Sequence, residues 1–186
     1  MDNQYIKEFI QKLEETEIWK GDTEKCEGYD EGINLLVDTF VQCKKNHSQV
    51  YFVGNGGSAA IAIHMVTDFM NNGGMKTGSL YNGAVMTGIG NDYGYEHVFS
   101  RQLEFLAGEN DLLVAISSSG NSRNIVNAIE AAKKKGAKTI TFTGFKKNNK
   151  AKQMGNVNIY VPCEKYGIVE SIHNLILQQI VDIIKG

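Results

Sequence analysis

Two short turns rich in glycine and serine are the parts of this 186-residue sequence best suited to bind a small ligand. Residues 54–58 read GNGGS and follow the apolar run 49–53, and residues 117–122 read SSSGNS and follow the apolar run 112–116. A stretch with helical periodicity comes after each turn. A helix amino terminus presents unpaired backbone N–H groups and the positive end of a dipole, which suits a phosphate group. Glycine lets the backbone approach such a ligand closely, and serine hydroxyls donate hydrogen bonds without adding charge.

The two turns together favour a small phosphorylated metabolite over a nucleotide. One such turn alone would be explained by a serine that caps a helix. Two turns in equivalent places, each at the end of an apolar run, indicate a ligand site instead, because ligands of open parallel sheets bind outside the carboxyl ends of the strands. Neither turn contains Gly-Lys followed by Ser or Thr, and residues 54–57 do not match G-x-G-x-x-G.

Polar side chains also interrupt two helical stretches that are otherwise apolar. His64 and Asp68 are four residues apart, hence on one helix face. The last helical stretch is apolar almost all round, yet it carries a polar stripe at i, i+4 and i+8, with a histidine beside it: Glu170, Asn174, Gln178 and His173. Buried polar groups are costly unless they are paired. The stripe therefore faces a cavity, a metal or a substrate, or it forms a polar seam between subunits, whereas a single histidine is more often structural.

The elements that must position these residues alternate between strands and helices. Short apolar, β-branched runs predict four strands, at 49–53, 112–116, 139–142 and 157–161, and a fifth at either 77–80 or 84–87. Helical periodicity predicts helices at 58–70, 95–106, 122–135 and 169–185. The first 47 residues read as a helical hairpin that breaks near residues 20–22. We therefore expect one α/β domain over residues 1–186, a three-layer sandwich whose five-stranded parallel sheet lies in residues 48–186, with residues 1–47 as a helical extension.

Composition argues against several other classes of protein. The formal net charge of −2 gives no general attraction to nucleic acid or to an anionic membrane, and the lysine clusters near residues 133–135 and 146–150 read as solvated surface. Three cysteines without CxxC spacing predict neither a disulfide framework nor a zinc finger. No apolar run approaches about 18 residues, and the amino terminus has no secretion signal, so we expect a cytosolic protein without a membrane span.

Several motifs together resemble a known family. Residues 54–60 (GNGGSAA) with His64, residues 90–95 (GNDYGY) and 99–102 (FSRQ), and the serine-rich turn 117–122 are similar to the signature blocks of phosphoheptose isomerases, which have the sugar isomerase (SIS) fold. The likeness runs from about Ile33 to the carboxyl end.

The resemblance implies roles for individual residues. It implies substrate contacts for six of them: Asn55, Gly56, Gly57, Ser58, Asn91 and Asp92. It implies a phosphate loop of four serines: Ser117, Ser118, Ser119 and Ser122. It implies a zinc or other divalent ion with four ligands: His64, Asp68, Glu170 and Gln178. The family residues at the positions of Asp68 and Gln178 also serve in proton transfer, and the carboxylate of Glu170 adds a third catalytic candidate.

This sequence departs from the family pattern at four of the corresponding positions. Asp68 stands where the family has glutamate, Asn72 where it has arginine, Glu170 where it has glutamine, and Gln178 where it has histidine. The shorter Asp68 displaces a carboxylate by roughly 1.5 Å, and a displacement of that size can cost about 10²-fold in rate. Gln178 cannot act as a general acid or base, but Glu170 restores a carboxylate nearby.

The implied reaction is the aldose–ketose isomerisation of sedoheptulose 7-phosphate to D-glycero-D-manno-heptose 7-phosphate, which feeds heptose synthesis for lipopolysaccharide or capsule. Asp68 or Glu170 would be the base. One alternative is an isomerase of another sugar phosphate. The other is a non-catalytic SIS protein, similar to relatives that bind a replication initiator, in which the departures reflect lost catalysis. The resemblance also implies a homotetramer with sites at subunit interfaces. The net charge and the absence of a long apolar run predict no direct contact with nucleic acid or membrane.

Overall fold

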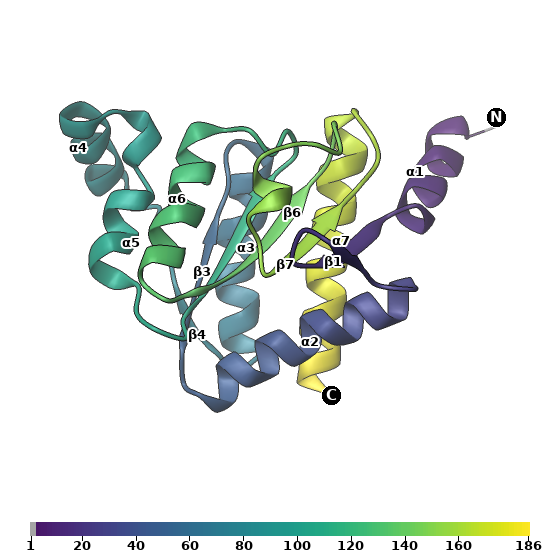
Figure 1. Cartoon of the computed structure of the whole chain (residues 1–186), viewed down its shortest axis with the longest axis horizontal. Coiled ribbons are helices and arrows are strands. Elements are labelled where there is room, and N and C mark those ends of the chain that lie inside the picture. Colours follow the sequence, from purple (N-terminus) through teal and green to yellow (C-terminus); the bar gives the residue numbers. More distant parts are fainter. Residues whose placement is uncertain (1–2) are drawn as a thin grey trace.

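A seven-stranded sheet organises the computed structural model, which describes residues 3–186 (Figure 1). The strand order is β2-β1-β7-β6-β5-β3-β4. In chain order the strands are β1 (Glu17–Lys20), β2 (Glu24–Lys25), β3 (Gln49–Val53), β4 (Lys76–Gly78), β5 (Leu112–Ser117), β6 (Lys138–Thr143) and β7 (Val157–Tyr160). The last five are mutually parallel, while β1 runs antiparallel to both β7 and β2.

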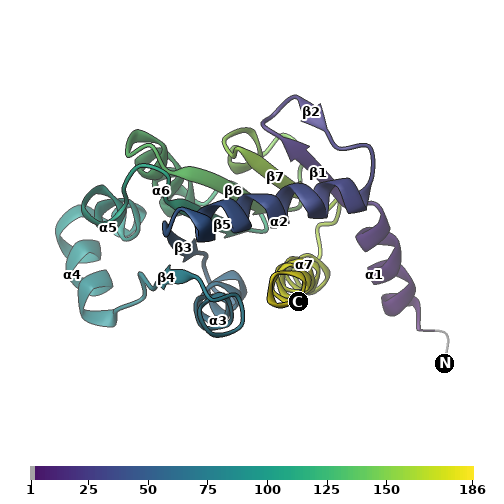
Figure 2. The ribbon, with the colours of Figure 1, turned by 90° about the horizontal axis from the view of Figure 1, so that it is seen from below.

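Helices cover both faces of this sheet. They are α1 (Gln4–Glu14), α2 (Tyr29–Lys45), α3 (Gly57–Asn71), α4 (Gly83–Tyr93), α5 (Ser100–Leu106), α6 (Arg123–Lys134) and α7 (Tyr166–Lys185), with 3₁₀ turns η1 (Tyr95–His97) and η2 (Ala151–Gln153). Side chains alternate along each strand, so Val50 and Phe52 pack with α2, α3 and α7, whereas Tyr51 and Val53 pack with α5 and α6. Figure 2 shows the two helical layers on either side of the sheet.

The predicted central strands and the helices that follow them are confirmed, with boundaries shifted by a few residues. The fifth parallel strand is β4, the first of the two alternatives, and residues 84–87 lie in α4, where Asn82 caps the helix by accepting a hydrogen bond from Val85 N (3.2 Å). The expected helix at 95–106 is divided into η1 and α5. That residues 1–186 form one domain stays a prediction.

Two predictions are wrong for the same reason. The sheet has seven strands instead of five, and the first 47 residues contain two strands between their helices. The chain between α1 and α2 is a β-hairpin that extends the sheet to seven strands. β1 pairs with β7 from Glu17 opposite Tyr160 to Lys20 opposite Val157, so it satisfies the backbone groups that would otherwise form an open edge. The Ile18 side chain is buried in the core and packs against Gly32. A β-carbon added at Gly32 would lie 2.5 Å from Cδ1 of Ile18.

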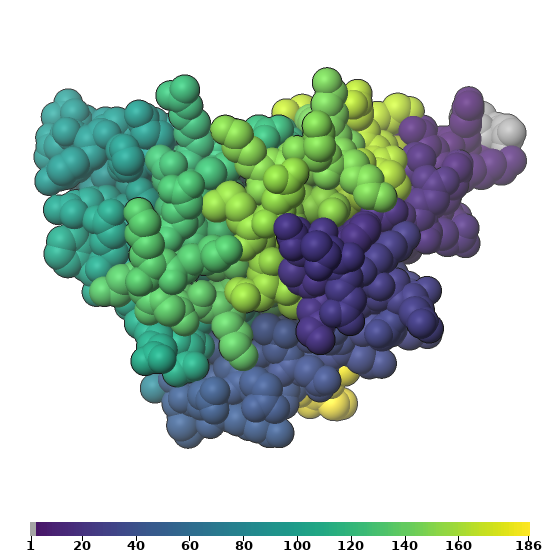
Figure 3. Space-filling view, in the orientation of Figure 1, coloured from purple at the N-terminus to yellow at the C-terminus, as the bar shows by residue number. Residues whose placement is uncertain are grey.

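Two helices project from opposite ends of the molecule. Figure 3 shows α1 at one end and the α4–α5 region at the other. None of the described residues of α1 or α4 is buried, and α1 exposes about half of the Tyr5, Ile6 and Ile10 side chains. Within residues 3–186 no helix is both long and apolar enough to cross a membrane.

The buried His173 is the most unusual polar group in the core. Its side chain lies on α7 with no exposed surface, its ring packs edge-on against Phe142, and its Nε2 lies 3.1 Å from Thr143 O. Nδ1 has no hydrogen-bond partner among residues 3–186. Burial disfavours the charged imidazolium and lowers the pKa of His173 to about 4, although the Thr143 carbonyl raises it in part.

His173 should make the fold sensitive to acid. The native pKa of about 4 lies below the ordinary 6.5, so this contribution is fully present above pH 6.5 and is lost as the pH falls toward 4. The loss should total roughly 3 kcal/mol of unfolding free energy. Urea unfolding between pH 4 and 8 measures it. His173→Gln, which keeps a donor for Thr143, should flatten this pH dependence, and His47→Asn, at an exposed position, should not. Equal slopes for His173→Gln and wild type would contradict the assignment.

Candidate functional site

The two predicted turns meet at one point on the sheet edge. β3 and β5 are parallel neighbours, with Val53 opposite Ala115. The chain leaves β3 through α3 to reach β4 on one side, and leaves β5 through α6 to reach β6 on the other. Such a reversal opens a crevice at the carboxyl ends of the two strands, because the crossover helices diverge there. The residues that follow each strand therefore face the same space.

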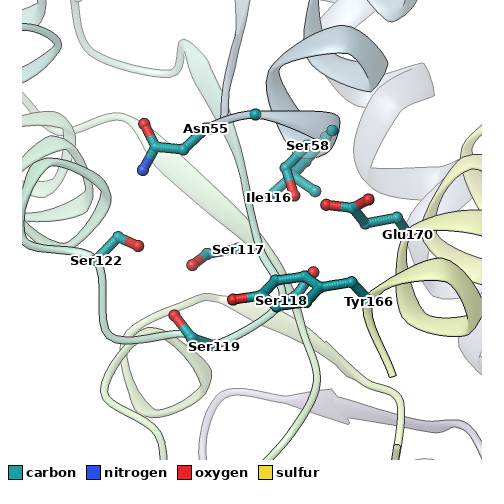
Figure 4. Close-up of a pocket in the computed structure, with 11 residues that line it drawn as sticks. Asn55, Ser58, Ile116, Ser117, Ser118, Ser119, Ser122, Tyr166 and Glu170 are labelled. Atoms are coloured by element: carbon teal, nitrogen blue, oxygen red, sulfur yellow. The ribbon is translucent and has the colours of Figure 1, made fainter. Parts of the chain in front are cut away.

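That crevice contains a pocket of about 330 Å³ (Figure 4). Most of the predicted ligand-binding residues line it, together with Ile116 and Tyr166: Asn55, Gly56, Gly57, Ser58, Ser117, Ser118, Ser119, Ser122 and Glu170. Within the described part of the chain, no lysine or arginine lines the pocket. An anion bound here would be held by neutral hydrogen-bond donors and helix amino termini.

The serine-rich turn offers donors that the protein leaves unpaired. The Ser118 hydroxyl is buried, lines the pocket, and has no hydrogen-bond partner among residues 3–186. Such a group is costly unless a ligand or water satisfies it. Ser122 occupies the N-cap position of α6 without making a side-chain cap bond. The turn itself is held by Gly120, which has φ of 63° and lies so close to Asn149 that any β-carbon would overlap it.

The glycine-rich turn is braced by residues that the sequence analysis did not single out. Asn55 and Asn124 exchange two amide hydrogen bonds of 2.9 and 2.8 Å, and the Tyr95 hydroxyl donates to Asn55 Oδ1 at 3.1 Å. The Tyr81 hydroxyl accepts from Gly54 N (2.6 Å) and donates to Gly54 O (2.9 Å). Asn124 could have been suspected, because it lies two residues after the serine-rich turn. Tyr95 is the last residue of the block 90–95, whereas Tyr81 carries no signal in the sequence.

Glu170 brings a carboxylate into this pocket from α7. Its carboxylate lies against Gly57 so closely that a β-carbon there would overlap it, which explains glycine at the first residue of α3. Partial burial raises the pKa of Glu170 above its ordinary value, and a backbone hydrogen bond from Ser58 offsets part of this. A carboxyl group with a raised pKa inside a ligand pocket is suited to acid–base chemistry.

The other predicted catalytic and metal-binding residues form a second cluster. His64 Nε2 lies 3.1 Å from Asp68 Oδ2, and Gln178 Nε2 lies 2.6 Å from Asp68 Oδ2 and 3.1 Å from His64 Nε2. Glu170 is not part of it, because eight residues of α7 separate Glu170 from Gln178, about 12 Å along the helix axis. The structure thus brings together three of the four predicted ligands, and within residues 3–186 no group of three or more His, Cys, Asp or Glu could hold a metal ion.

The chemistry of the three clustered groups fits a divalent ion on one condition. Turning the Gln178 amide by 180° would present its oxygen in place of the nitrogen. Two of the three donor pairs, at 3.1 Å, lie close to the spacing of about 3.3 Å expected between neighbouring ligands of a tetrahedral zinc ion with bonds of about 2.0 Å. The Asp68–Gln178 pair, at 2.6 Å, would have to move apart to reach that spacing. In the observed rotamer the amide NH₂ instead bridges Asp68 and His64.

Asn91 and Asp92 lie outside the pocket. They belong to the last turn of α4, both are exposed, and Asn91 Nδ2 donates to Asp92 Oδ1 at 2.9 Å. Neither lines the pocket of the same chain. The predicted contact of Asn91 and Asp92 with substrate is therefore not made from the lining of this pocket within one chain.

Comparison with known proteins agrees with this geometry. A family model described as SIS domain matches residues 20–144. The phosphoheptose isomerase of Sulfurimonas denitrificans is 37% identical over 97% of this chain and 94% of its own length. The chain belongs to the phosphoheptose isomerase family.

Solved structures of this family share the fold. A phosphoheptose isomerase from Francisella tularensis superposes with a TM-score of 0.84 at 29% identity, over 98% of this chain and 95% of its own. The phosphoheptose isomerase GmhA from Neisseria gonorrhoeae superposes with a TM-score of 0.77 at 33% identity, over 82% and 84%. Family membership therefore rests on nearly the whole chain, including the hairpin-containing amino-terminal part.

The contact between Gly57 and Glu170 predicts the effect of adding one methyl group. Gly57→Ala would push the Glu170 carboxylate into the space where an anion would bind, so affinity for a sugar phosphate should fall at least about tenfold, or about 1.4 kcal/mol. Isothermal titration calorimetry with sedoheptulose 7-phosphate measures this. Gly28→Ala, just before α2 with open space around it, is the matched control and should bind like wild type. Unchanged affinity of Gly57→Ala would contradict the described packing.

Proposed function

We propose that this protein is an aldose–ketose isomerase that interconverts sedoheptulose 7-phosphate and D-glycero-D-manno-heptose 7-phosphate, feeding heptose synthesis for surface polysaccharide. The observation that carries the proposal is a pocket, in a phosphoheptose isomerase family member, that combines an unpaired buried Ser118 hydroxyl with the Glu170 carboxylate. The first supplies a donor for the phosphate. The second supplies a group for proton transfer.

The isomerisation requires a base and a binding site for the phosphate. A base removes a proton α to a carbonyl, and the proton returns to the neighbouring carbon through an enediolate, while the phosphate is held firmly. In our proposal the turn at residues 117–122 and the amino terminus of α3 hold the phosphate. Glu170 moves the proton, because its raised pKa brings it closer to neutral pH than an ordinary carboxyl group. Asp68 is the weaker of the two predicted bases, since it does not line this pocket and already accepts a hydrogen bond from Gln178.

A divalent ion, zinc in the first place, is part of the proposal. His64, Asp68 and Gln178 would hold it once the Gln178 amide turns. Such an ion supplies Lewis acidity toward a substrate oxygen when it is bound. The cluster's donors come from α3 and α7, the two helices that also supply Gly57 and Glu170.

We also propose that the protein assembles as a homotetramer in the cytosol. The exposed apolar side chains of α1 and the unburied α4 support an assembly, since surfaces of this kind mark interaction sites. In such an assembly Asn91 and Asp92 of one copy would face the pocket of another. All three cysteines, Cys26, Cys43 and Cys163, are free thiols, as is usual in a reducing compartment.

Turnover of sedoheptulose 7-phosphate by the purified protein, with zinc supplied, tests the proposed function. Glu170→Gln removes the proton-transfer group while keeping its shape, so kcat/KM should fall at least about 100-fold. Ser171→Ala, at the exposed neighbouring position on α7, should leave the rate within about twofold. If wild type turns over no sugar phosphate but is stabilised thermally by one, the protein is instead a non-catalytic phosphosugar-binding protein. If the protein turns over only a different sugar phosphate, that compound replaces sedoheptulose 7-phosphate as the proposed substrate.

Zinc binding gives a separate prediction. Gln178→His would add an imidazole between His64 and Asp68, and histidine is a stronger zinc ligand than an amide. Zinc affinity, measured by competition with a chromogenic chelator, should rise at least about tenfold. Gln178→Ala, which offers no ligand, should bind zinc more weakly than wild type. Equal affinities across the three proteins would show that this cluster is not the zinc site.

A further inference from the structure

Tyr166 forms one wall of the pocket and has no role in the predicted site. It is the first residue of α7, and 60% of its surface is exposed although it lines the pocket. Figure 4 shows its ring extending from α7 across the pocket toward the turn that carries Ser117, Ser118 and Ser119. Its hydroxyl makes no hydrogen bond with any residue in the described range 3–186.

The ring is held in place from behind. It packs edge-on against Phe145, with ring centroids 4.8 Å apart and planes at 74°. Phe145 is itself fixed by two backbone hydrogen bonds, because its N–H donates to Cys163 O (2.9 Å) and its carbonyl accepts from the Tyr160 hydroxyl (2.8 Å). The wall is therefore preorganised, which lowers the entropy cost of binding against it.

The first turn of α7 is also braced from α1. Lys165 Nζ lies 2.6 Å from Glu8 Oε2, and a β-carbon at Gly167 would lie 2.7 Å from the Tyr5 hydroxyl. These contacts flank Tyr166 in sequence on both sides. They place the ring without using its hydroxyl.

The pocket depends on neutral hydrogen-bond donors, and the Tyr166 hydroxyl is one. Its lining contains no lysine or arginine within the described residues, so every neutral donor counts toward binding an anion. Among the described lining residues, Tyr166 is the large side chain that offers exposed carbon surface, since Ile116 is fully buried. A phenol ring can shield a bound phosphate from water, and a phenol hydroxyl can donate to one of its oxygens.

We infer that Tyr166 is a substrate-binding residue whose hydroxyl donates to the phosphate of the bound sugar phosphate and whose ring covers that phosphate. The inference rests on the proposed function for the identity of the sugar. The requirement for a phosphate does not depend on turnover.

Two variants separate the hydroxyl from the ring. Tyr166→Phe keeps the packing on Phe145, so thermal stability should not change, while affinity for inorganic phosphate should fall about fivefold to tenfold. KM for sedoheptulose 7-phosphate should rise by the same factor, with kcat within about twofold. Tyr166→Ala loses the ring as well, and phosphate affinity should fall more than about tenfold. Tyr29→Phe, which removes a tyrosine hydroxyl that bonds Gln179 outside the pocket, should leave phosphate affinity and KM unchanged.

The outcomes distinguish this inference from the proposed function. A purely structural Tyr166 predicts that Tyr166→Phe binds phosphate and substrate as tightly as wild type, and that result overturns the inference. If wild type binds phosphate but isomerises no sedoheptulose 7-phosphate, the proposed function fails, and weaker phosphate binding by Tyr166→Phe still supports the inference. If wild type binds neither phosphate nor any sugar phosphate, both are wrong.

Discussion

The adjacency of β3 and β5 is the constraint on which the site depends. Both strands run in the same direction and end at the same edge, and their crossover connections leave in opposite directions. No helix therefore covers the space between the two turns, and the amino termini of α3 and α6 border it. Hydrogen-bond donors from two segments about sixty residues apart in sequence converge there because the sheet places them there. Without this pairing each turn would be an ordinary helix start.

Among residues 3–186, no lysine or arginine side chain lines this pocket. The donors in the lining are backbone N–H groups, serine hydroxyls, the Asn55 amide and a phenol, and within the described part of the chain Glu170 is its one charged group. A carboxylate beside an anion is unfavourable, and burial already raises the pKa of Glu170. A bound phosphate would raise this pKa further, because like charges disfavour ionisation. A raised pKa disfavours the ionised form of Glu170. It also brings the pKa closer to neutral pH, where a carboxyl group is better suited to proton transfer.

The central fold could be predicted from the sequence because its strands are buried on both faces. Apolar, β-branched runs such as residues 112–116 read as strands without any tertiary information. The β1–β2 hairpin could not be predicted this way. Its four-residue strand Glu17–Lys20 has two charged ends and becomes extended because β7 offers an unpaired edge. The helix of residues 84–87 was ambiguous because small apolar residues occur in both kinds of element.

The site was predictable to the extent that its residues lie in the two turns. The serines and glycines of residues 54–58 and 117–122 line one pocket, as their places after parallel strands suggested. The grouping of Glu170 with Gln178 came from family resemblance, whereas helix geometry separates the two residues by two turns. Tyr81 and Tyr166 reach the site through tertiary packing, which no local pattern in the sequence reports. Tyr95 lies in the block 90–95, but its hydrogen bond to Asn55 also depends on tertiary packing.

A crystal structure of the protein with bound sedoheptulose 7-phosphate tests the account most directly. The account predicts phosphate density within hydrogen-bond distance of the Ser118 hydroxyl and the backbone N–H groups of residues 117–122, with the sugar extending toward Glu170. Phosphate density elsewhere on the protein, with the Ser118 hydroxyl still unpaired or bonded only to water, would contradict it.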